Sequence, residues 1–142
     1  MFFKRNRGEI LKMIDYFVNK SDTLYAITFR LDEDIERIAI GKLGQFDFQK
    51  GYYVYVGSAK RNITARIERH LKINKKKRWH IDYLRPHLHI QAVQSYPERE
   101  GECQLFERLR SEHNASMPVK GFGSSDCKCY SHLFYFKNEE DL

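Results

Sequence analysis

The sequence lacks a hydrophobic run long enough to cross a membrane. Its longest uninterrupted apolar or aromatic stretch, 52–56, is far shorter than the roughly 18 to 20 residues that a bilayer crossing needs. The first residues carry charges and contain no apolar run ahead of a small-residue cleavage site, so they do not resemble a secretory signal peptide. We therefore expect a cytoplasmic protein.

Cysteine is scarce as well. The chain contains three cysteines, Cys103, Cys127 and Cys129, and the last two are separated by a single residue. An odd number with this spacing cannot form a complete disulfide framework. The cysteine content therefore favours a reducing compartment.

The chain also lacks the length for two full domains, and it contains no internal repeat or low-complexity segment. Its 142 residues suffice for a single core, since domains typically run about 100 to 150 residues. Hydrophobic residues make up 42% and charged residues 31%, a composition that excludes a disordered tail. We therefore expect one domain that folds alone.

Acidic residues are nearly missing from the segment 60–78, where basic residues gather. The whole chain has 25 Lys plus Arg and a net charge of +6, whereas 60–78 contains nine basic residues and one acidic residue, Glu68. Such a segment attracts polyanions, of which nucleic acid is the commonest; the alternative is a solvated helix face. The candidate nucleic-acid-binding residues are Lys60, Arg61, Arg69, Lys75, Lys76, Lys77 and Arg78.

Hydrophobic periodicity predicts an α+β domain with a small, mainly antiparallel central sheet flanked by helices. Apolar residues at helical spacing predict an extra helix over 9–19, within an N-terminal helical extension (1–22) that precedes the main domain (23–142). The strands at 23–31 and 35–40 are expected to pair as a hairpin. The later elements are expected in this order: a loop over 41–51, a strand over 52–56, a helix carrying Ile63, Ile67 and Leu71, a helix over 79–84, a strand over 90–96, a helix over 98–112, a loop over 117–129 and a strand over 133–136.

Tyr25 stands in the first strand of the main domain, Tyr55 and Gly57 end a later strand, and Arg66 lies on the next helix. These residues resemble the GIY-YIG nuclease family, in which two motif strands are followed by a helix that carries a catalytic arginine. The chain departs from the usual family pattern at Thr23, where glycine is usual, and at Ser58, where lysine is frequent.

Longer strings are similar to an uncharacterised prokaryotic branch of the same superfamily. They are GYYVYVGSA at 51–59, WHIDYL at 79–84, GFG at 121–123 and SDC at 125–127. The resemblance spans most of the chain. It implies a metal-dependent endonuclease that hydrolyses phosphodiester bonds and leaves a 5′-phosphate, with DNA repair or processing as its setting.

The resemblance also implies roles for single residues. Tyr25 would take the proton of the attacking water, Tyr55 would orient that water or support the base, and Arg66 would stabilise the transition state. Gly57 and His80 would shape the site. On the helix wheel Arg66 borders the apolar stripe, where a guanidinium can present its planar donors to a phosphate. The alternatives are an arginine that covers the edge of the core and tyrosines that are half-buried residues of a sheet.

The family uses one divalent cation, expected to be Mg²⁺ or Mn²⁺, held chiefly by a glutamate on a later helix. Glu102 and Glu107 are the candidates, and we prefer Glu102 because it lies in line with Leu105 and Leu109 on the apolar face. A carboxylate forced toward a core needs a cation or a donor. The alternative is a helix-start glutamate stabilised by the helix dipole.

A second polar cluster contains Cys103, Cys127, Cys129 and His132. These residues could form a tetrahedral zinc site, but Cys-x-Cys is tighter than the usual ligand spacing. Sequence reasoning therefore favours cysteines that pack a loop against a helix.

Nucleic acid, DNA before RNA, is the partner we expect, with a repair protein as a further candidate. A catalytically inactive DNA- or RNA-binding module of the same fold is the alternative to an enzyme. A basic surface that meets an acidic protein is a third reading. The sequence does not determine the oligomeric state.

Overall fold

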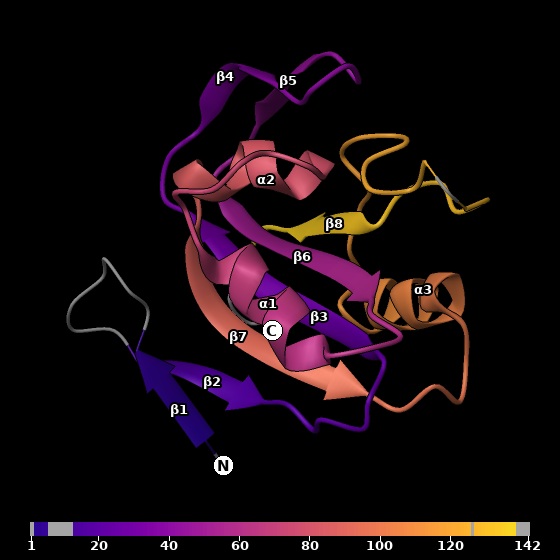
Figure 1. Ribbon diagram of the computed structural model, residues 1–142. Coiled ribbons are helices and arrows are strands. Elements are labelled where there is room, and N and C mark those ends of the chain that lie inside the picture. Colours follow the sequence, from indigo (N-terminus) through magenta and orange to yellow (C-terminus); the bar gives the residue numbers. More distant parts are fainter. Residues whose placement is uncertain (1, 6–12, 126, 139–142) are drawn as a thin grey trace.

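A mixed sheet of six strands runs through the molecule and carries helices on its two faces (Figure 1). The computed structural model describes residues 2–5, 13–125 and 127–138 of the chain. Among the pairings in this sheet, only that of β2 with β7 is parallel, which confirms the expected α+β class with a mainly antiparallel sheet. In spatial order the strands are β1 (Phe2–Arg5), β2 (Met13–Phe17), β7 (His89–Tyr96), β3 (Leu24–Leu31), β6 (Gly51–Ser58) and β8 (Leu133–Phe136).

Strand β3 lies at the centre of the sheet, with β6 bonded to one edge and β7 to the other. Its β-branched and aromatic residues favour a pleated, buried strand. The register places Tyr25 opposite Gly57 and Ile27 opposite Tyr55. Two strands that are separated in sequence therefore bring their tyrosines to neighbouring positions.

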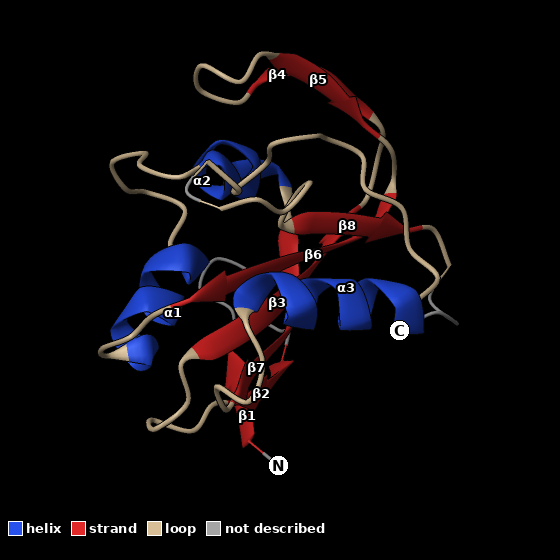
Figure 2. Ribbon diagram, turned by 90° about the vertical axis from the view of Figure 1, so that its right-hand side faces the viewer, coloured by secondary structure: helices blue, strands red, loops and turns tan. Residues whose placement is uncertain are grey.

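Side-chain alternation along β3 and β6 divides the core into two layers. Tyr25 and Tyr55 face the layer that contains α1 (Ile63–Leu71) and α2 (His80–Leu84). The alternate residues, such as Ala26 and Val54, pack instead with α3 (Glu102–Glu112). Figure 2 shows α1 and α2 on one side of the sheet, with α3 extending toward the other. Along β6, Tyr53 and Tyr55 thus pack in one layer, and Tyr52, Val54 and Val56 pack in the other.

The expected N-terminal helix is wrong where the structure describes it. Residues 13–17 form strand β2, which pairs with β1 and runs parallel to β7, while 9–12 lie outside the described residues. A short apolar run fits helical and extended periodicity equally well. The edge of β7 favours the extended conformation, because it supplies backbone partners for β2. In this conformation the side chain of Ile14 is buried, with a relative exposure of 1%.

The expected hairpin between 23–31 and 35–40 is also wrong. Strand β4 (Ile35–Ala39) pairs with β5 (Gln45–Phe48), which falls inside the segment expected to be a loop, and the two form a separate small sheet. The physical reason is that β6 and β7 already occupy both edges of β3. No backbone groups of β3 remain for β4 to pair with.

The remaining elements fall close to their expected positions. Helices α1 and α2 and strands β7 and β8 follow the predicted order, and a short 3₁₀ turn, Arg85–His87, which was not predicted, follows α2. Helix α3 begins at Glu102 rather than at 98, because Gly101 is extended and caps the helix. This later start makes Glu102 the first residue of the helix. Within the described residues, no helix has the length and apolar character needed to span a membrane.

We predict that Gly57→Ala destabilises the fold and displaces Tyr25. A Cβ at Gly57 would lie 2.5 Å from Cζ of Tyr25, whose ring is buried and cannot move freely. Overpacking of this kind costs about 1 to 3 kcal/mol of unfolding free energy, measurable by urea denaturation. Gly101→Ala is the matched control, because the nearest atom to its Cβ is a side-chain oxygen 3.4 Å away. Equal losses in the two variants would contradict the prediction.

Candidate functional site

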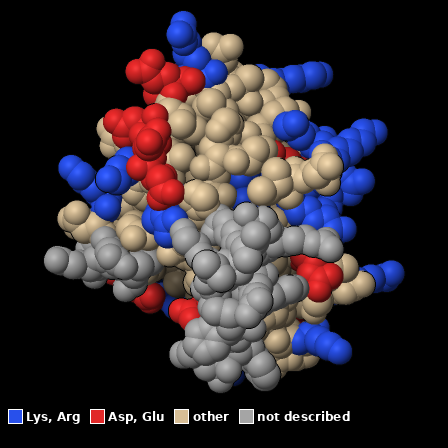
Figure 3. Space-filling view, turned by 90° about the vertical axis from the view of Figure 1, so that its left-hand side faces the viewer, with Lys and Arg blue, Asp and Glu red and all other residues tan. Residues whose placement is uncertain are grey.

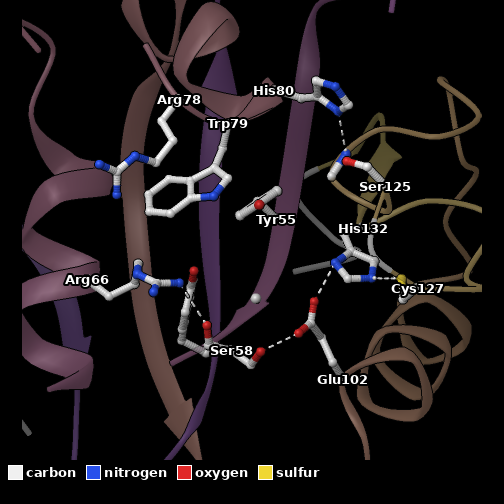
Figure 4. Close-up of a pocket in the computed structure, with 13 residues that line it drawn as sticks. Tyr55, Ser58, Arg66, Arg78, Trp79, His80, Glu102, Ser125, Cys127 and His132 are labelled. Atoms are coloured by element: carbon white, nitrogen blue, oxygen red, sulfur yellow. Dashed lines mark hydrogen bonds and ion pairs between the residues drawn. The ribbon is translucent and has the colours of Figure 1, made fainter. Parts of the chain in front are cut away.

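A pocket of about 280 Å³ lies where β6 ends, between α1, the start of α2, the start of α3 and the loop before β8 (Figure 4). These elements are distant in sequence, so only the folded chain forms the pocket. The residues predicted from sequence that line it are Tyr25, Tyr55, Gly57, Arg66, Arg78, His80 and Glu102. Other residues of the lining are Ser58, Trp79, Gly123, Ser125, Cys127 and His132.

The two tyrosines of the pocket are buried and protonated. Tyr25 has a relative exposure of 2% and Tyr55 of 5%. Burial raises the pKa of both hydroxyls well above the usual value, and the nearby charge of Arg66 only partly opposes this effect. Both hydroxyl groups are therefore protonated at neutral pH.

His70 contacts Tyr25 directly, with 2.7 Å between its Nε2 and the tyrosine hydroxyl. Burial, and then the charge of Lys75, lowers the pKa of His70 to about 3, although Asp82 acts in the opposite direction. A neutral imidazole can accept the hydroxyl hydrogen of Tyr25 at Nε2. Its buried Nδ1 has no hydrogen-bond partner within the described part of the chain. Sequence reasoning assigned no role to His70; its polar character one turn after Arg66 was the available signal.

Arg66 belongs to a cluster of guanidinium groups around Trp79. Its Nη1 donates to the Ser58 carbonyl at 3.0 Å, and its Cζ lies 4.7 Å from the centre of the indole ring. Arg69 and Arg78 lie 4.4 Å and 5.5 Å from the same ring centre. Cation–π attraction to Trp79 helps to hold these like charges together. The pocket therefore has one strongly cationic wall, whose central indole sequence reasoning did not identify.

Glu102 lies across the pocket from Arg66 (Figure 4). Its Oε2 accepts a hydrogen bond from the Ser58 hydroxyl, and its Oε1 lies 2.6 Å from Nδ1 of His132. Burial would raise the pKa of Glu102, but the contacts with His132 and Ser58 and the charge of Arg66 lower it below the usual value. The side chain is therefore a carboxylate at neutral pH. His132 and Ser58 were not predicted as its partners.

Among the described residues that line the pocket, Glu102 is the one that carries a carboxylate. Glu107 lies elsewhere on α3, with 57% of its side chain exposed, and it pairs with Arg110. A divalent cation such as Mg²⁺ fits Glu102, because this ion commonly uses one or two carboxylates and keeps several waters. Each oxygen of Glu102 also has lone pairs beyond its single contact.

His80 connects α2 to the loop that closes the pocket. Its Nδ1 accepts a hydrogen bond from the backbone N–H of Gly123 at 2.8 Å, and its ring contacts Phe122. Burial lowers the pKa of His80, which keeps the acceptor nitrogen unprotonated at neutral pH. Gly123 has a positive φ of 71°, a conformation that favours glycine. His80 thus holds Gly123 at the pocket, and its role in shaping the site stays a prediction.

The basic residues predicted to bind nucleic acid divide into two groups. Lys60, Arg61, Lys76, Lys77 and Arg78 are exposed. In Figure 3 most Lys and Arg side chains gather along one edge of the face shown, whereas Asp and Glu gather on the opposite upper side.

Lys75 and Arg69 form the second group, because they contact the protein itself. The Lys75 side chain is only 7% exposed, and its Nζ donates to the carbonyls of Arg69 and His70 at the end of α1. Burial lowers the pKa of Lys75 to about 8, although Asp82 lies 3.3 Å away. Arg69 donates to Asp82 and to the carbonyl of Lys76. These two cations stabilise the loop between α1 and α2 and offer little of their charge to a phosphate.

Asp82 is the anion that holds this loop together. Its side chain is fully buried, and it accepts hydrogen bonds from the backbone N–H groups of Arg78 and Trp79 and from Arg69. Burial would raise the pKa of Asp82, but these donors and the charge of Lys75 lower it below the usual value. The position of Trp79 in the pocket therefore depends on a buried carboxylate outside the pocket lining.

We predict that Asp82→Asn lowers the unfolding free energy by about 3 to 5 kcal/mol at pH 7, because it breaks a buried ion pair. A depressed pKa in the folded state means that the contribution of Asp82 is present above its unfolded pKa of about 3.9 and is lost as pH falls through the folded value. The difference between wild type and variant should therefore shrink when urea denaturation is repeated below pH 4.

The control for Asp82→Asn is Asp32→Asn, which removes a carboxylate 52% exposed from a surface pair with Arg30. This change should cost less than about 1 kcal/mol. A loss for Asp82→Asn that is the same at both pH values would contradict the assignment to the Asp82 charge.

Comparison with known proteins assigns the chain to a family, but the description of this family names no activity. No curated protein and no solved structure matches the chain. One family model, described as a domain of unknown function, matches residues 24–142. This range begins at the first residue of β3 and includes every residue named above for the pocket. Because the match extends over most of the sequence, the chain belongs to the family described as domain of unknown function DUF123.

Proposed function

We propose that this protein is a metal-dependent endonuclease of the GIY-YIG type, which hydrolyses phosphodiester bonds of nucleic acid, DNA before RNA, in the cytoplasm. The observation that carries the proposal is that Tyr25, Tyr55, Arg66 and Glu102 line one pocket although they come from four different elements. These are the residues that the resemblance to GIY-YIG nucleases marks. DNA repair or processing, with a repair protein as partner, is the setting we propose for this activity.

The cationic wall of the pocket supports binding of a scissile phosphate. Arg66 is oriented by the Ser58 carbonyl and by Trp79, so its guanidinium is held in place before substrate arrives. A preorganised donor stabilises the charge that develops on the phosphoryl oxygens more effectively than water does. Arg78, which is exposed and lines the same pocket, extends positive charge toward the surface. The exposed basic residues Lys60, Arg61, Lys76 and Lys77 would hold neighbouring backbone phosphates.

Proton removal from the attacking water is assigned to Tyr25 and His70. The raised pKa of Tyr25 excludes a phenolate at neutral pH. The Tyr25 hydroxyl must therefore release its own hydrogen while it accepts a proton from the attacking water. Its partner at 2.7 Å, Nε2 of His70, accepts the hydrogen bond of the Tyr25 hydroxyl in the resting arrangement. Because the pKa of His70 is lowered to about 3, the imidazole orients this hydroxyl and does not retain the proton, which passes on to solvent. In this scheme the water oxygen forms a bond to phosphorus, the bond to the 3′ oxygen breaks, the leaving 3′ oxygen takes a proton from solvent, and the product strand carries a 5′-phosphate. Tyr55 would orient the water.

Glu102 is the residue that would hold the divalent cation, Mg²⁺ or Mn²⁺. When bound, the cation would supply positive charge to the phosphate and acidify a coordinated water. Ser58 and His132 orient the carboxylate for this role. The same contacts support the alternative of a catalytically inactive module that binds DNA or RNA, because both carboxylate oxygens already have protein partners. Cleavage assays distinguish the two readings.

We predict that Glu102→Gln and Arg66→Ala each reduce cleavage at least about 100-fold while binding is largely retained, because each removes an electrostatic contact to the transition state. The assay uses single-stranded, duplex, branched and flapped DNA and RNA, with Mg²⁺ or Mn²⁺ and with chelator. Binding is measured by fluorescence anisotropy.

Glu107→Gln is the matched control for Glu102→Gln, since both residues lie on α3 but only Glu102 lines the pocket. It should cleave like wild type. Tight binding without any cut product across the panel would reject the nuclease and support the inactive module. No binding at low salt would reject both readings.

We also predict that Tyr25→Phe lowers the cleavage rate about 100- to 10,000-fold, the usual range for losing a general acid–base group. The substitution removes one hydroxyl and keeps the ring that packs against Gly57. Tyr53→Phe is the control, because Tyr53 is as buried as Tyr25 and lies on the same face of the sheet, but its hydroxyl donates to the Gln49 carbonyl outside the pocket. A Tyr25→Phe enzyme with wild-type single-turnover rates would remove Tyr25 from the mechanism.

A further inference from the structure

Three cysteines and a histidine come together beside the pocket, at the start of α3 and in the loop before β8. The ligand atoms of Cys103, Cys127, Cys129 and His132 all lie within 4.8 Å of one another. Nε2 of His132 is 3.1 Å from Sγ of Cys127 and 3.2 Å from Sγ of Cys129. Around a tetrahedral zinc ion, sulfur and nitrogen ligands stand about 3.5 to 3.8 Å apart, as bond lengths of about 2.3 and 2.0 Å require. Once the disulfide that joins Cys103 to Cys129 is reduced, side-chain movements of these two cysteines would bring the four atoms to these separations.

His132 is oriented as a metal-binding histidine would be. Its side chain is only 3% exposed, and Nδ1 lies 2.6 Å from Oε1 of Glu102. Proteins commonly fix the ring of a metal ligand by pairing its second nitrogen with a carboxylate. A carboxylate at this distance favours a proton on Nδ1, which leaves the lone pair on Nε2, the nitrogen that lies 3.1 and 3.2 Å from the two sulfur atoms. The arrangement combines three soft sulfur ligands with one imidazole, a donor set typical of structural zinc sites.

We propose that, in its reduced state, the protein binds one Zn²⁺ ion through Cys103, Cys127, Cys129 and His132. The close Cys-x-Cys spacing, which weighed against zinc in the sequence, is compensated in space because α3 supplies the third sulfur. The role of the ion is structural, since four protein ligands leave no open position. This inference stands independently of the proposed nuclease activity.

The same sulfur atoms have a second state. Cys103 and Cys129 are joined by a disulfide in the structure, while Cys127 is free. A dithiol reductant breaks the S–S bond by supplying two electrons and two protons, and it becomes a disulfide itself. Zn²⁺ then displaces the protons of the three thiols to solvent. The disulfide and the metal are therefore mutually exclusive.

Zinc would anchor a long loop that lacks the hydrogen-bonding pattern of helices and strands. Residues 113–132 join α3 to β8 and contain neither a helix nor a strand in the part that the structure describes, apart from one isolated bridge at Ser116. Loops longer than about 12 to 15 residues are uncommon in compact domains unless they are functional or anchored. A metal that joins Cys127, Cys129 and His132 to Cys103 would anchor this loop to α3.

The test is a metal titration of the full chain after reduction and removal of metal with a chelator. Co²⁺ should bind with one ion per chain, giving visible bands of a tetrahedral site and near-ultraviolet sulfur-to-metal charge transfer, and one equivalent of Zn²⁺ should abolish both signals. Zinc-loaded protein should protect three thiols from a thiol reagent until chelator is added. The oxidised protein should bind neither ion in this way.

Cys127→Ser is the decisive variant, because it removes a zinc ligand and leaves the Cys103–Cys129 disulfide able to form. It should weaken zinc binding at least about 100-fold, more than the 10- to 100-fold loss expected for the outer partner change Glu102→Gln. Ser125→Ala, a pocket-lining neighbour outside the ligand set, should bind like wild type. The proposal is overturned if reduced, folded wild type gives no tetrahedral Co²⁺ spectrum, or if Cys127→Ser retains it unchanged.

Discussion

Hydrogen bonding along both edges of β3 is the constraint on which the rest of the structure depends. Because β6 occupies one edge in a fixed register, Tyr25 faces Gly57 and the absence of a Cβ leaves room for the tyrosine ring. Helix α1 follows β6 directly and covers the same face of the sheet, which brings Arg66 and His70 to the tyrosines. The geometry of the pocket is therefore a consequence of strand register and of side-chain alternation.

Burial, as much as residue type, decides which side chains of the pocket carry a charge. Both tyrosines and His70 are neutral because desolvation disfavours their charged forms, so the arginines and the carboxylate in the described lining are Arg66, Arg78 and Glu102. The cations around Trp79 are compatible with one another because the buried Asp82 carboxylate balances part of their charge from behind. A cationic wall thus faces the Glu102 carboxylate across a space open to a ligand.

Glu102 connects two sites that could each involve a metal. On one side it faces the proposed substrate pocket, and on the other it orients His132 toward the cysteines. Cys103 follows Glu102 in sequence, so any movement of the first turn of α3 affects both sites together. A structural ion among the cysteines would therefore also fix the carboxylate in the pocket. The N-terminal turn of α3 is the mechanical link between them.

The sequence by itself predicted most elements, because periodicity is a local property. The family resemblance marked Tyr25, Tyr55 and Arg66, and helix-face geometry selected Glu102 over Glu107. Only the tertiary structure decided which strand edges pair, and this is why 13–17 and 45–48 became strands against expectation. It also decided the contacts of His70, the partners of Glu102 and the burial of Lys75. These features depend on groups that meet across long chain separations, where local propensity carries no information about the neighbour.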